Sequence, residues 1–342
     1  MNMINIAILG FGVVGGGVYE VIKQNGLPVT VKHILDKRTF PGHDLENAVT
    51  TDFSAIIDDP AVDVVVETMG GASPAYEFSL AALRAGKSVV TSNKMVVEKY
   101  GDELKSVAAE NNVSYLYEAS AGGGIPVIHP IRRCLRANKI TRVAGILNGT
   151  TNYILRRMTD GIDFAAALKE AQAKGYAEAD PTADICGYDT ARKIAILATE
   201  AFGRLFRYED CAEITGIDKL TTEQINAAAG MGYRIKLLGV AENNGGKYSL
   251  FVSPCLVKDD TLFAATGGVF NAVSVTGNMV GEVVFYGQGA GSLATASAVV
   301  SDILETADTP ALYGRQSRVA KEELAAPRLE KRNICGVEFY VI

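Results

Sequence analysis

The stretch INIAILGFGVVGGGVYEVIKQNG (4–26) decides the fold of the first part of the chain. Its opening residues, INIAILG (4–10), form a short apolar run rich in isoleucine, which is typical of a buried β-strand. The residues that follow, 12–26, have the pattern of a helix that ends at Gly26. The sequence therefore predicts a strand, a glycine-rich turn and a helix in direct succession.

Apolar runs and helical patterns continue to alternate up to about residue 122. Further strands are predicted over VTVKHILD (29–36), AVDVVVETMG (61–70), KSVVTSNK (87–94) and VSYLYEASAG (113–122). Between the last three of these runs the pattern predicts helices over 74–86 and 98–112. Strands separated by helices imply right-handed crossovers and a parallel sheet. We therefore expect the α/β class, with an N-terminal Rossmann-type parallel sheet.

After about residue 130, long helical stretches mix with strand-like runs. Helices are predicted over 164–175, 190–203 and 295–307, and strands over 142–150, 247–257 and 282–289. This change predicts a dinucleotide-binding domain over 1–130 and a second, α+β domain over 131–310. The C-terminal segment 311–342 is expected to pack back on the nucleotide domain. The alternative is that 131–342 only elaborates a single domain.

The composition argues against several classes of function. With a net charge of −6 and no basic block, a nucleic-acid partner has no support. No apolar run approaches the ~18 residues that a membrane span requires. Only three histidines are present, which argues against a His-rich metal site. The five cysteines are widely and irregularly spaced, as expected for reduced thiols in a cytoplasmic protein.

The turn GFGVVG (10–15) matches G-x-G-x-x-G after a predicted strand and at the start of a predicted helix. In this pattern Gly10 permits a tight turn, Gly12 lets a pyrophosphate approach the backbone, and Gly15 allows close packing of helix on strand. The helix N-terminus adds free N–H groups that favour a phosphate. The motif predicts a bound NAD or NADP; the alternative is a purely structural turn.

The residues that end the second predicted strand give conflicting signals about the cofactor. Asp36 stands where an acid would hold the ribose hydroxyls of NAD. Lys37 and Arg38 follow directly, and could bind the 2′-phosphate of NADP. Both cofactors therefore stay open, with the basic pair favouring NADP(H).

The second informative stretch, KGYAEADPTADICGYDTARKIAILA (174–198), is rich in acids and contains no histidine. Lys193 follows Asp189 by one helical turn, so the two side chains share a helix face. A lysine can donate a proton in a reaction whose hydride comes from a nicotinamide, and such a reaction needs no protein nucleophile. The alternative is a surface ion pair worth ~0.3–0.5 kcal/mol.

Several stretches together resemble homoserine dehydrogenases. They are FGVVGGGV (11–18), TSNK (91–94), EASAGGGIPVI (118–128), ILNGTTNYIL (146–155), GYAEADPTADICGYDTARKIAILA (175–198) and GQGAGSLATASAVVSDI (287–303). The resemblance implies reversible, NAD(P)-dependent reduction of L-aspartate 4-semialdehyde to L-homoserine, in the route to threonine and methionine. It also implies that the second domain carries catalysis and dimerisation, and that the partner in a homodimer is a second copy of the chain.

The resemblance also implies roles for individual residues. Lys193 would donate the proton, and Asp189 would hold either the reacting oxygen or the lysine. The expected cofactor-binding residues are Gly10, Phe11, Gly12, Val13, Val14, Gly15, Asp36, Lys37, Arg38, Gly70, Lys94, Gly175 and Gly289. The expected substrate contacts are Glu178, Asp184, Asp189, Asn148 and Thr150. Of these, Asn148 and Thr150 could instead cap a helix that begins near Thr151.

One carboxylate beside several accessible carbonyls suits a hard cation, and EASAGGGIP (118–126) offers both. The resemblance implies a monovalent cation, Na⁺ or K⁺, held by the Glu118 side chain and by carbonyls near Ala121, Gly123 and Ile125. The alternative for this stretch is a glycine hinge. Many members of the family carry a C-terminal amino-acid-sensing domain, and feedback through such a domain is not expected for a chain that stops at Ile342.

Two other functions compete with this interpretation. An aldehyde-to-acyl-phosphate dehydrogenase, such as aspartate-semialdehyde dehydrogenase, would need a thiolate nucleophile, for which Cys134 in RRCLRA is the nearest candidate. A non-enzymatic nucleotide-sensing module would keep GFGVVG. It would have no use for Glu178, Asp189 and Lys193 together.

Overall fold

A computed structural model describes residues 3–307 and 316–342 of the chain. The chain divides into two compact units, each built from two segments. The first unit comprises Met1–Pro126 and Gly291–Gln316, and the second comprises Val127–Ala290 and Ser317–Ile342. Among the described residues, no helix has the length and apolar character needed to cross a membrane.

The first unit is built on a six-stranded sheet in which every neighbouring pair of strands is parallel. Its strands are β1 (Ile4–Leu9), β2 (Val29–Leu35), β3 (Val49–Thr50), β4 (Val64–Glu67), β5 (Ser88–Thr91) and β6 (Tyr115–Leu116). Their order is β3-β2-β1-β4-β5-β6, the doubly wound order of dinucleotide-binding folds. The predicted α/β class and the N-terminal Rossmann-type sheet are confirmed.

The strand predicted over 113–122 is wrong beyond Leu116, because the chain turns into a short 3-10 helix, η2 (Glu118–Ser120). The other helices of this unit are α1 (Val13–Asn25), α2 (Ser54–Ile57), α3 (Ala75–Arg84), α4 (Lys94–Glu110) and α11 (Ser292–Glu305), with a further 3-10 turn η1 (Glu46–Ala48).

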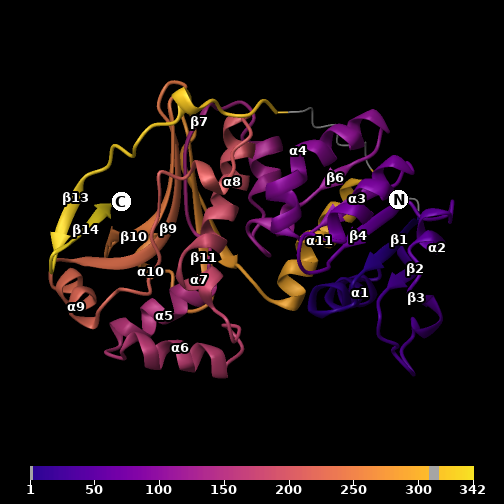
Figure 1. The fold of residues 1–342 in the computed structure, drawn as a ribbon, viewed down its shortest axis with the longest axis horizontal. Coiled ribbons are helices and arrows are strands. Elements are labelled where there is room, and N and C mark those ends of the chain that lie inside the picture. The colour runs from indigo at the N-terminus through magenta and orange to yellow at the C-terminus, as the bar shows by residue number, and fades with distance from the viewer. Residues whose placement is uncertain (1–2, 308–315) are drawn as a thin grey trace. The chain divides into compact units, whose positions relative to one another are not determined.

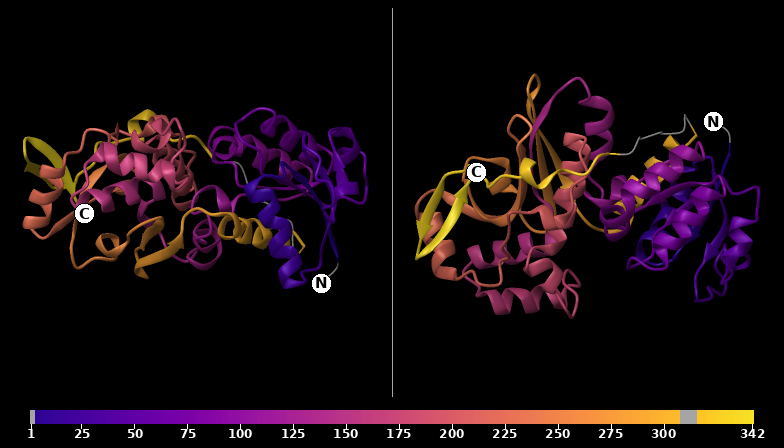
Figure 2. Two further views of the ribbon diagram at one scale, coloured as in Figure 1. Left: turned by 90° about the horizontal axis from the view of Figure 1, so that it is seen from below. Right: turned by 45° about the horizontal axis from the view of Figure 1, so that its top comes forward.

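Helix α11 packs against α1 in the first unit, although the predicted range 131–310 would place it in the second domain (Figures 1 and 2). Its buried residues Val299 and Ile303 share a core with Val18 of α1. Close approach depends on Gly17, where a Cβ atom would lie 2.6 Å from the Ser292 Oγ. Apolar burial against α1 therefore places α11 in the first unit.

The second unit contains an eight-stranded mixed sheet (Figure 1). Its strands are β7 (Ile140–Ile146), β8 (Glu213–Ile214), β9 (Tyr233–Asn243), β10 (Tyr248–Lys258), β11 (Phe270–Gly277), β12 (Gly281–Gln288), β13 (Lys331–Ile334) and β14 (Val337–Val341). Its helices are α5 (Gly149–Thr159), α6 (Phe164–Ala173), α7 (Thr182–Ile185), α8 (Tyr188–Phe202), α9 (Thr222–Gly230) and α10 (Leu262–Ala265). Short turns are η3 (Pro130–Cys134), η4 (Tyr208–Asp210) and η5 (Lys321–Glu323). The sheet order is β12-β11-β7-β9-β10-β14-β13, and β8 pairs with β10.

Helix α8 lies against β7 and β9, with Ile194 and Leu197 fully buried. Gly239 of β9 allows this approach, because a Cβ atom there would lie 3.0 Å from the Ile194 Cβ and 3.1 Å from the Thr190 Cγ2. The packing fixes α8, and with it Asp189 and Lys193 on its first turns, on a rigid sheet.

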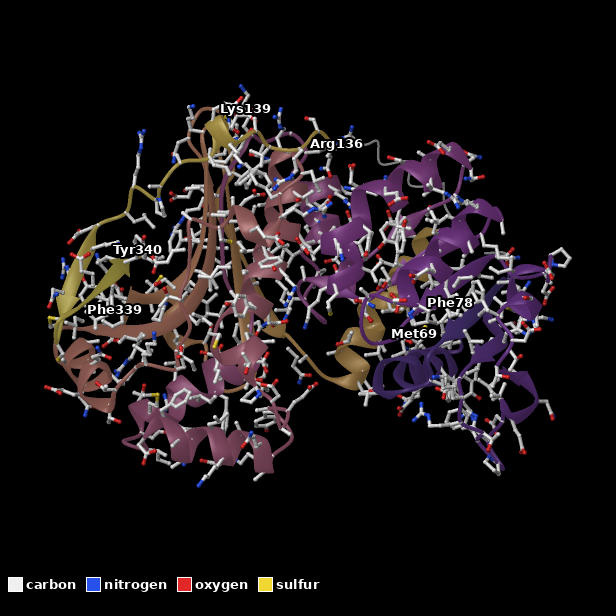
Figure 3. All side chains as sticks on the ribbon, viewed as in Figure 1. Met69, Phe78, Arg136, Lys139, Phe339 and Tyr340 are labelled. Atoms are coloured by element: carbon white, nitrogen blue, oxygen red, sulfur yellow. The ribbon has the colours of Figure 1, made fainter. Side chains whose placement is uncertain are left out.

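The C-terminal segment packs differently from the expectation that 311–342 returns to the nucleotide domain. Residues 308–315 lie outside the described residues, but β14 pairs in parallel with β10 of the second unit, with Tyr340 opposite Cys255. Phe339 and Tyr340, labelled in Figure 3, are 1% and 5% exposed. Burial of these two aromatic rings holds the segment on the second sheet.

Candidate active site

The glycine turn of the first unit has the backbone that its sequence predicts. Gly10 has a φ of +88°, a left-handed conformation that favours glycine. At Gly15 a Cβ atom would lie only 2.2 Å from the Gly10 carbonyl oxygen, so only a glycine fits there. At Gly12, which precedes α1, a Cβ atom would meet none of the described residues within 4 Å, and no side chain among them caps the helix. The start of α1 is therefore open to a phosphate group.

Asp36 closes this turn from the end of β2. One of its oxygens accepts the Phe11 N–H at 2.8 Å and an Arg38 Nη2–H at 2.8 Å. The other accepts the Arg38 backbone N–H and its Nε–H, at 2.9 and 3.0 Å. The bonds from Arg38 hold the pKa of the Asp36 carboxyl well below its usual range, so Asp36 stays ionised.

A cavity of about 540 Å³ opens beside the glycine turn. Its lining residues are Gly10, Gly12, Leu35, Asp36, Lys37, Arg38, Thr51, Thr68, Met69, Gly70, Pro74 and Phe78. Met69 and Phe78 are labelled in Figure 3. The cavity combines apolar walls, a bare helix N-terminus and two cationic side chains, which fits a dinucleotide with an aromatic base and phosphates.

Not every expected cofactor residue lies in this cavity. Phe11 is 7% exposed and packs edge-on against Phe40, with ring centroids 5.2 Å apart. Val13 is 73% exposed on the first turn of α1, and Val14 packs against the core. Lys94 is the first residue of α4 and is half-buried.

In the second unit, α7, the start of α5 and the first turns of α8 bring four predicted residues together. Lys193 Nζ lies 2.9 Å from Asp189 Oδ2 and donates to the Leu147 carbonyl at 2.8 Å. Asn148 Nδ2 donates to Asp189 Oδ2 at 2.9 Å and to Asp184 Oδ1 at 2.7 Å. The Asp189 and Lys193 side chains are only 4% and 12% exposed, so the pair is not the solvent-exposed ion pair of the alternative interpretation.

Asn148 uses its whole side chain in this cluster. Its Oδ1 accepts the Thr151 N–H at 2.8 Å and caps α5, while its Nδ2 joins the two acids. Thr150 donates its hydroxyl to the Tyr176 carbonyl at 2.6 Å, which ties the start of α5 to the acid-rich loop. The alternative role as a helix cap is thus confirmed for Asn148, on a helix that begins at Gly149.

The acid-rich loop itself is open to solvent. Gly175, with a φ of +74°, turns the chain out of α6, and the Glu178 side chain is exposed. Asp180 accepts the N–H and the hydroxyl of Thr182, and so shapes the turn before α7. Gly289 is buried against Asn271, whose side-chain amide would lie 1.9 Å from an added Cβ atom.

Of the expected cation ligands, Glu118 lies in η2 of the first unit, and Ala121, Gly123 and Ile125 follow it along the chain. Glu118 is 5% exposed, and its backbone N–H donates to Asp302 Oδ2 at 2.8 Å. Gly123 has a φ of +61°. Within the described part of the chain, His, Cys, Asp and Glu side chains form no group of three that could hold a metal ion.

Sequence reasoning missed several residues at the ends of β4 and β5. Thr68 lines the cavity, and its hydroxyl donates to the Gly10 carbonyl at 2.7 Å. Asn93 caps α4, where Lys94 is the first residue. The available signal was their position, since ligands of parallel sheets bind beyond the carboxyl ends of the strands.

Comparison with known proteins agrees with these features. The profile of homoserine dehydrogenase matches residues 126–304, and that of the homoserine dehydrogenase NAD-binding domain matches residues 10–118. A homoserine dehydrogenase of Bacillus subtilis is 42% identical over 316 residues, covering 89% of this chain and 73% of that relative.

Solved structures give the same result. The crystal structure of a homoserine dehydrogenase from Thiobacillus denitrificans has a TM-score of 0.84 at 41% identity, covering 94% of this chain and 78% of that one. A hyperthermophilic archaeal homoserine dehydrogenase mutant in complex with NADPH has a TM-score of 0.76 at 28% identity, covering 89% of this chain and 97% of that one. The chain therefore belongs to the homoserine dehydrogenase family of NAD(P)-dependent oxidoreductases.

Proposed function

We propose that this chain catalyses the reversible NAD(P)-dependent reduction of L-aspartate 4-semialdehyde to L-homoserine. The observation that carries this proposal is the buried Asp189–Lys193 pair, which Asn148 joins to Asp184. An open acidic loop precedes the pair along the chain. A zwitterionic substrate with a reactive oxygen needs such a combination of fixed charges and one proton donor. The reaction also requires a nicotinamide cofactor, and the glycine turn of the first unit is suited to bind it.

Lys193 is the residue that exchanges a proton with the substrate. When bound, the nicotinamide exchanges a hydride with C4 of the substrate. During reduction, Lys193 Nζ gives a proton to the oxygen on that carbon, and during oxidation it accepts one. The Asp189 carboxylate, 2.9 Å away, pairs with the Lys193 Nζ and fixes its direction. The greater burial of Asp189 supports this division, in which Lys193 touches the oxygen and Asp189 positions the lysine.

The charged ends of the substrate require different partners. Glu178 and Asp184 are anions on or beside the acidic loop, and either suits an α-ammonium group. The substrate carboxylate suits the start of α5, where Thr150 and the positive end of the helix dipole lie. Asn148 is assigned a positioning role, because its amide already holds both acids and the cap of α5.

The test is oxidation of L-homoserine by the purified protein, followed at the nicotinamide absorbance with NAD and NADP in parallel. We expect turnover with at least one cofactor, and none with L-serine, whose shorter chain places its hydroxyl one carbon closer to the ammonium group. The Cys134→Ser variant should keep nearly full activity, because Cys134 is exposed and no thiolate step is required. Absence of a homoserine-dependent rate with either cofactor would refute the assignment.

For the cofactor we propose a preference for NADP(H). Both oxygens of Asp36 already accept hydrogen bonds from Arg38 and Phe11, whereas Lys37 and Arg38 present positive charge to the cavity. The Arg38→Ser variant should raise KM for NADP at least about tenfold, the worth of one charge-assisted hydrogen bond. KM for NAD should change less than about threefold in the same variant.

A matched control for Arg38 is Lys32→Ser, which removes an exposed cation from β2 outside the cavity lining. This variant should leave both KM values unchanged. Equal losses for NAD and NADP in Arg38→Ser would show that Arg38 only supports the glycine turn and does not select the cofactor.

We also propose a monovalent cation at Glu118, Ala121, Gly123 and Ile125. The tightness of the turn supports it, since a Cβ atom on Gly122 would lie 2.4 Å from the Ile125 carbonyl oxygen. Activity should be higher in NaCl or KCl than in choline chloride at equal ionic strength; equal rates in all three salts would refute the site.

The assembly and location of the protein complete the proposal. We infer a homodimer formed through the second unit, where β12 is an edge strand with Tyr286 half-exposed on it. Light scattering should give twice the mass of the chain.

We place the protein in the cytoplasm, as its five free cysteines suggest, and cell fractionation tests this.

A further inference from the structure

Glu67, the last residue of β4, is a buried carboxylic acid whose side-chain hydrogen bonds within the described residues include no basic partner. Its side chain is fully buried, and burial raises its pKa. It accepts the Thr91 hydroxyl at 2.6 Å, the Met69 N–H at 2.8 Å and the Asn93 amide at 3.4 Å. A buried acid costs folding free energy unless its hydrogen bonds are made, and the proposed reaction gives it no chemical role.

The partners of Glu67 connect two loops that follow neighbouring strands. Thr91 receives the Asn93 N–H at 2.9 Å, which links the end of β5 to the start of α4. Asn93 donates its amide to the Gly71 carbonyl at 2.6 Å, which holds the loop after β4. Its amide oxygen accepts the N–H groups of Met95 and Val96, so the same side chain caps the helix that Lys94 begins.

The residue next to Glu67 fixes the same loop from the opposite side. Thr68 donates its hydroxyl to the Gly10 carbonyl at 2.7 Å and to the Leu9 carbonyl at 3.1 Å. Residues 68–70 form one wall of the cofactor cavity. This wall is therefore held between the glycine turn on one side and the Glu67–Thr91–Asn93 network on the other.

We propose that Glu67 is a positioning residue for the cofactor. Its carboxyl group fixes the 68–70 wall and the N-terminus of α4 in one arrangement, so that the cavity is preformed before NADPH binds. A preformed site binds more tightly because less ordering is required on binding. The inference rests on the proposed function only where homoserine turnover is used as a readout.

The decisive variants are Glu67→Gln and Glu67→Ala, with NADPH binding followed by its own fluorescence. Glu67→Ala leaves the Met69 N–H and the Thr91 hydroxyl without their acceptor, and we expect Kd for NADPH to rise at least about tenfold. Glu67→Gln can accept from Met69 and donate to Thr91, so Kd should return to within about threefold of the wild type. In the homoserine assay, KM for the cofactor should rise by more than kcat falls.

A purely structural role predicts a different pattern. Glu67→Ala would then lower Tm and leave Kd and KM of the folded protein unchanged, which would overturn the proposal. If Glu67→Ala does not fold, Thr91→Val serves in its place, because it keeps the shape of the side chain while it removes the 2.6 Å bond to Glu67 and the acceptor of the Asn93 N–H. Thr91→Val should raise Kd severalfold, and an unchanged Kd would equally overturn the proposal.

Tyr115→Phe is the matched control. Tyr115 is fully buried, its hydroxyl has no hydrogen-bond partner among the described residues, and its pKa is raised by burial and by the nearby Glu67 charge. Removing this hydroxyl should leave Kd for NADPH unchanged. A wild-type protein that binds NADPH without oxidising homoserine would refute the proposed function and leave the Glu67 experiment interpretable.

Discussion

Lys193→Ala is expected to lower kcat for homoserine oxidation by at least about a hundredfold, the usual contribution of a positioned general acid–base group. The variant removes the atom that exchanges a proton with the reacting oxygen. It also leaves Asp189 buried without its cationic partner at 2.9 Å, which adds to the loss. Steady-state rates at saturating homoserine and NADP measure the effect, and Tm shows whether the second unit remains folded.

Lys193→Arg separates charge from proton transfer. Its guanidinium can pair with Asp189 but does not release a proton in the working range of pH. The kcat of this variant should therefore stay low, while its KM for homoserine should be close to that of the wild type. Lys169→Ala, an exposed lysine of α6, should behave as the wild type. An alanine variant with unchanged kcat and a raised KM would make Lys193 a binding residue instead.

Gly15→Ala is expected to abolish measurable NADPH binding, a loss of at least about a hundredfold, because one methyl group cannot be accommodated. The added Cβ would lie 2.2 Å from the Gly10 carbonyl oxygen and 3.0 Å from the Thr68 hydroxyl. The backbone of the turn must shift to relieve this overlap, and the helix N-terminus that would hold the pyrophosphate shifts with it. Fluorescence titration with NADPH measures the loss.

For the neighbouring glycine, Gly16, substitution by alanine should have the opposite result. A Cβ atom on Gly16 would meet nothing within 4 Å, and Gly16 lies inside α1. Gly16→Ala should therefore keep NADPH binding and raise stability by about 0.5–1 kcal/mol, the usual gain for alanine in a helix. Equal binding by the Gly15→Ala and Gly16→Ala variants would show that the turn does not hold the cofactor.

Local patterns predicted the parts of the site whose residues are close in sequence. The G-x-G-x-x-G turn follows from the order of strand, glycines and helix, and the Asp189–Lys193 contact follows from one turn of helix spacing. Asp180 accepts the hydroxyl of Thr182, which is only two residues further along the chain. In each case the backbone geometry that matters is set by the neighbouring residues.

Contacts between distant segments could not be predicted in this way. Asn148 joins Asp184 and Asp189 from 36 and 41 residues away, a contact set by how α7 packs against α5 and α8. Glu67 looked like the end of an apolar strand, and nothing in its local pattern indicates the hydrogen bonds with Thr91 and Asn93. Helix α11 was assigned by its place in the chain, whereas its apolar face decides where it packs.

The position of α11 has a consequence for biosynthesis. The first unit takes its last helix from Ser292–Glu305, so the ribosome must complete residues 127–290 before that unit can close its core. Until then Val18 and Ile22 of α1 lack the partners that cover them in the finished protein. We therefore expect the nascent nucleotide-binding unit to expose apolar surface that chaperones bind during synthesis, and a fragment cut after residue 126 to aggregate instead of serving as a portable cofactor-binding module.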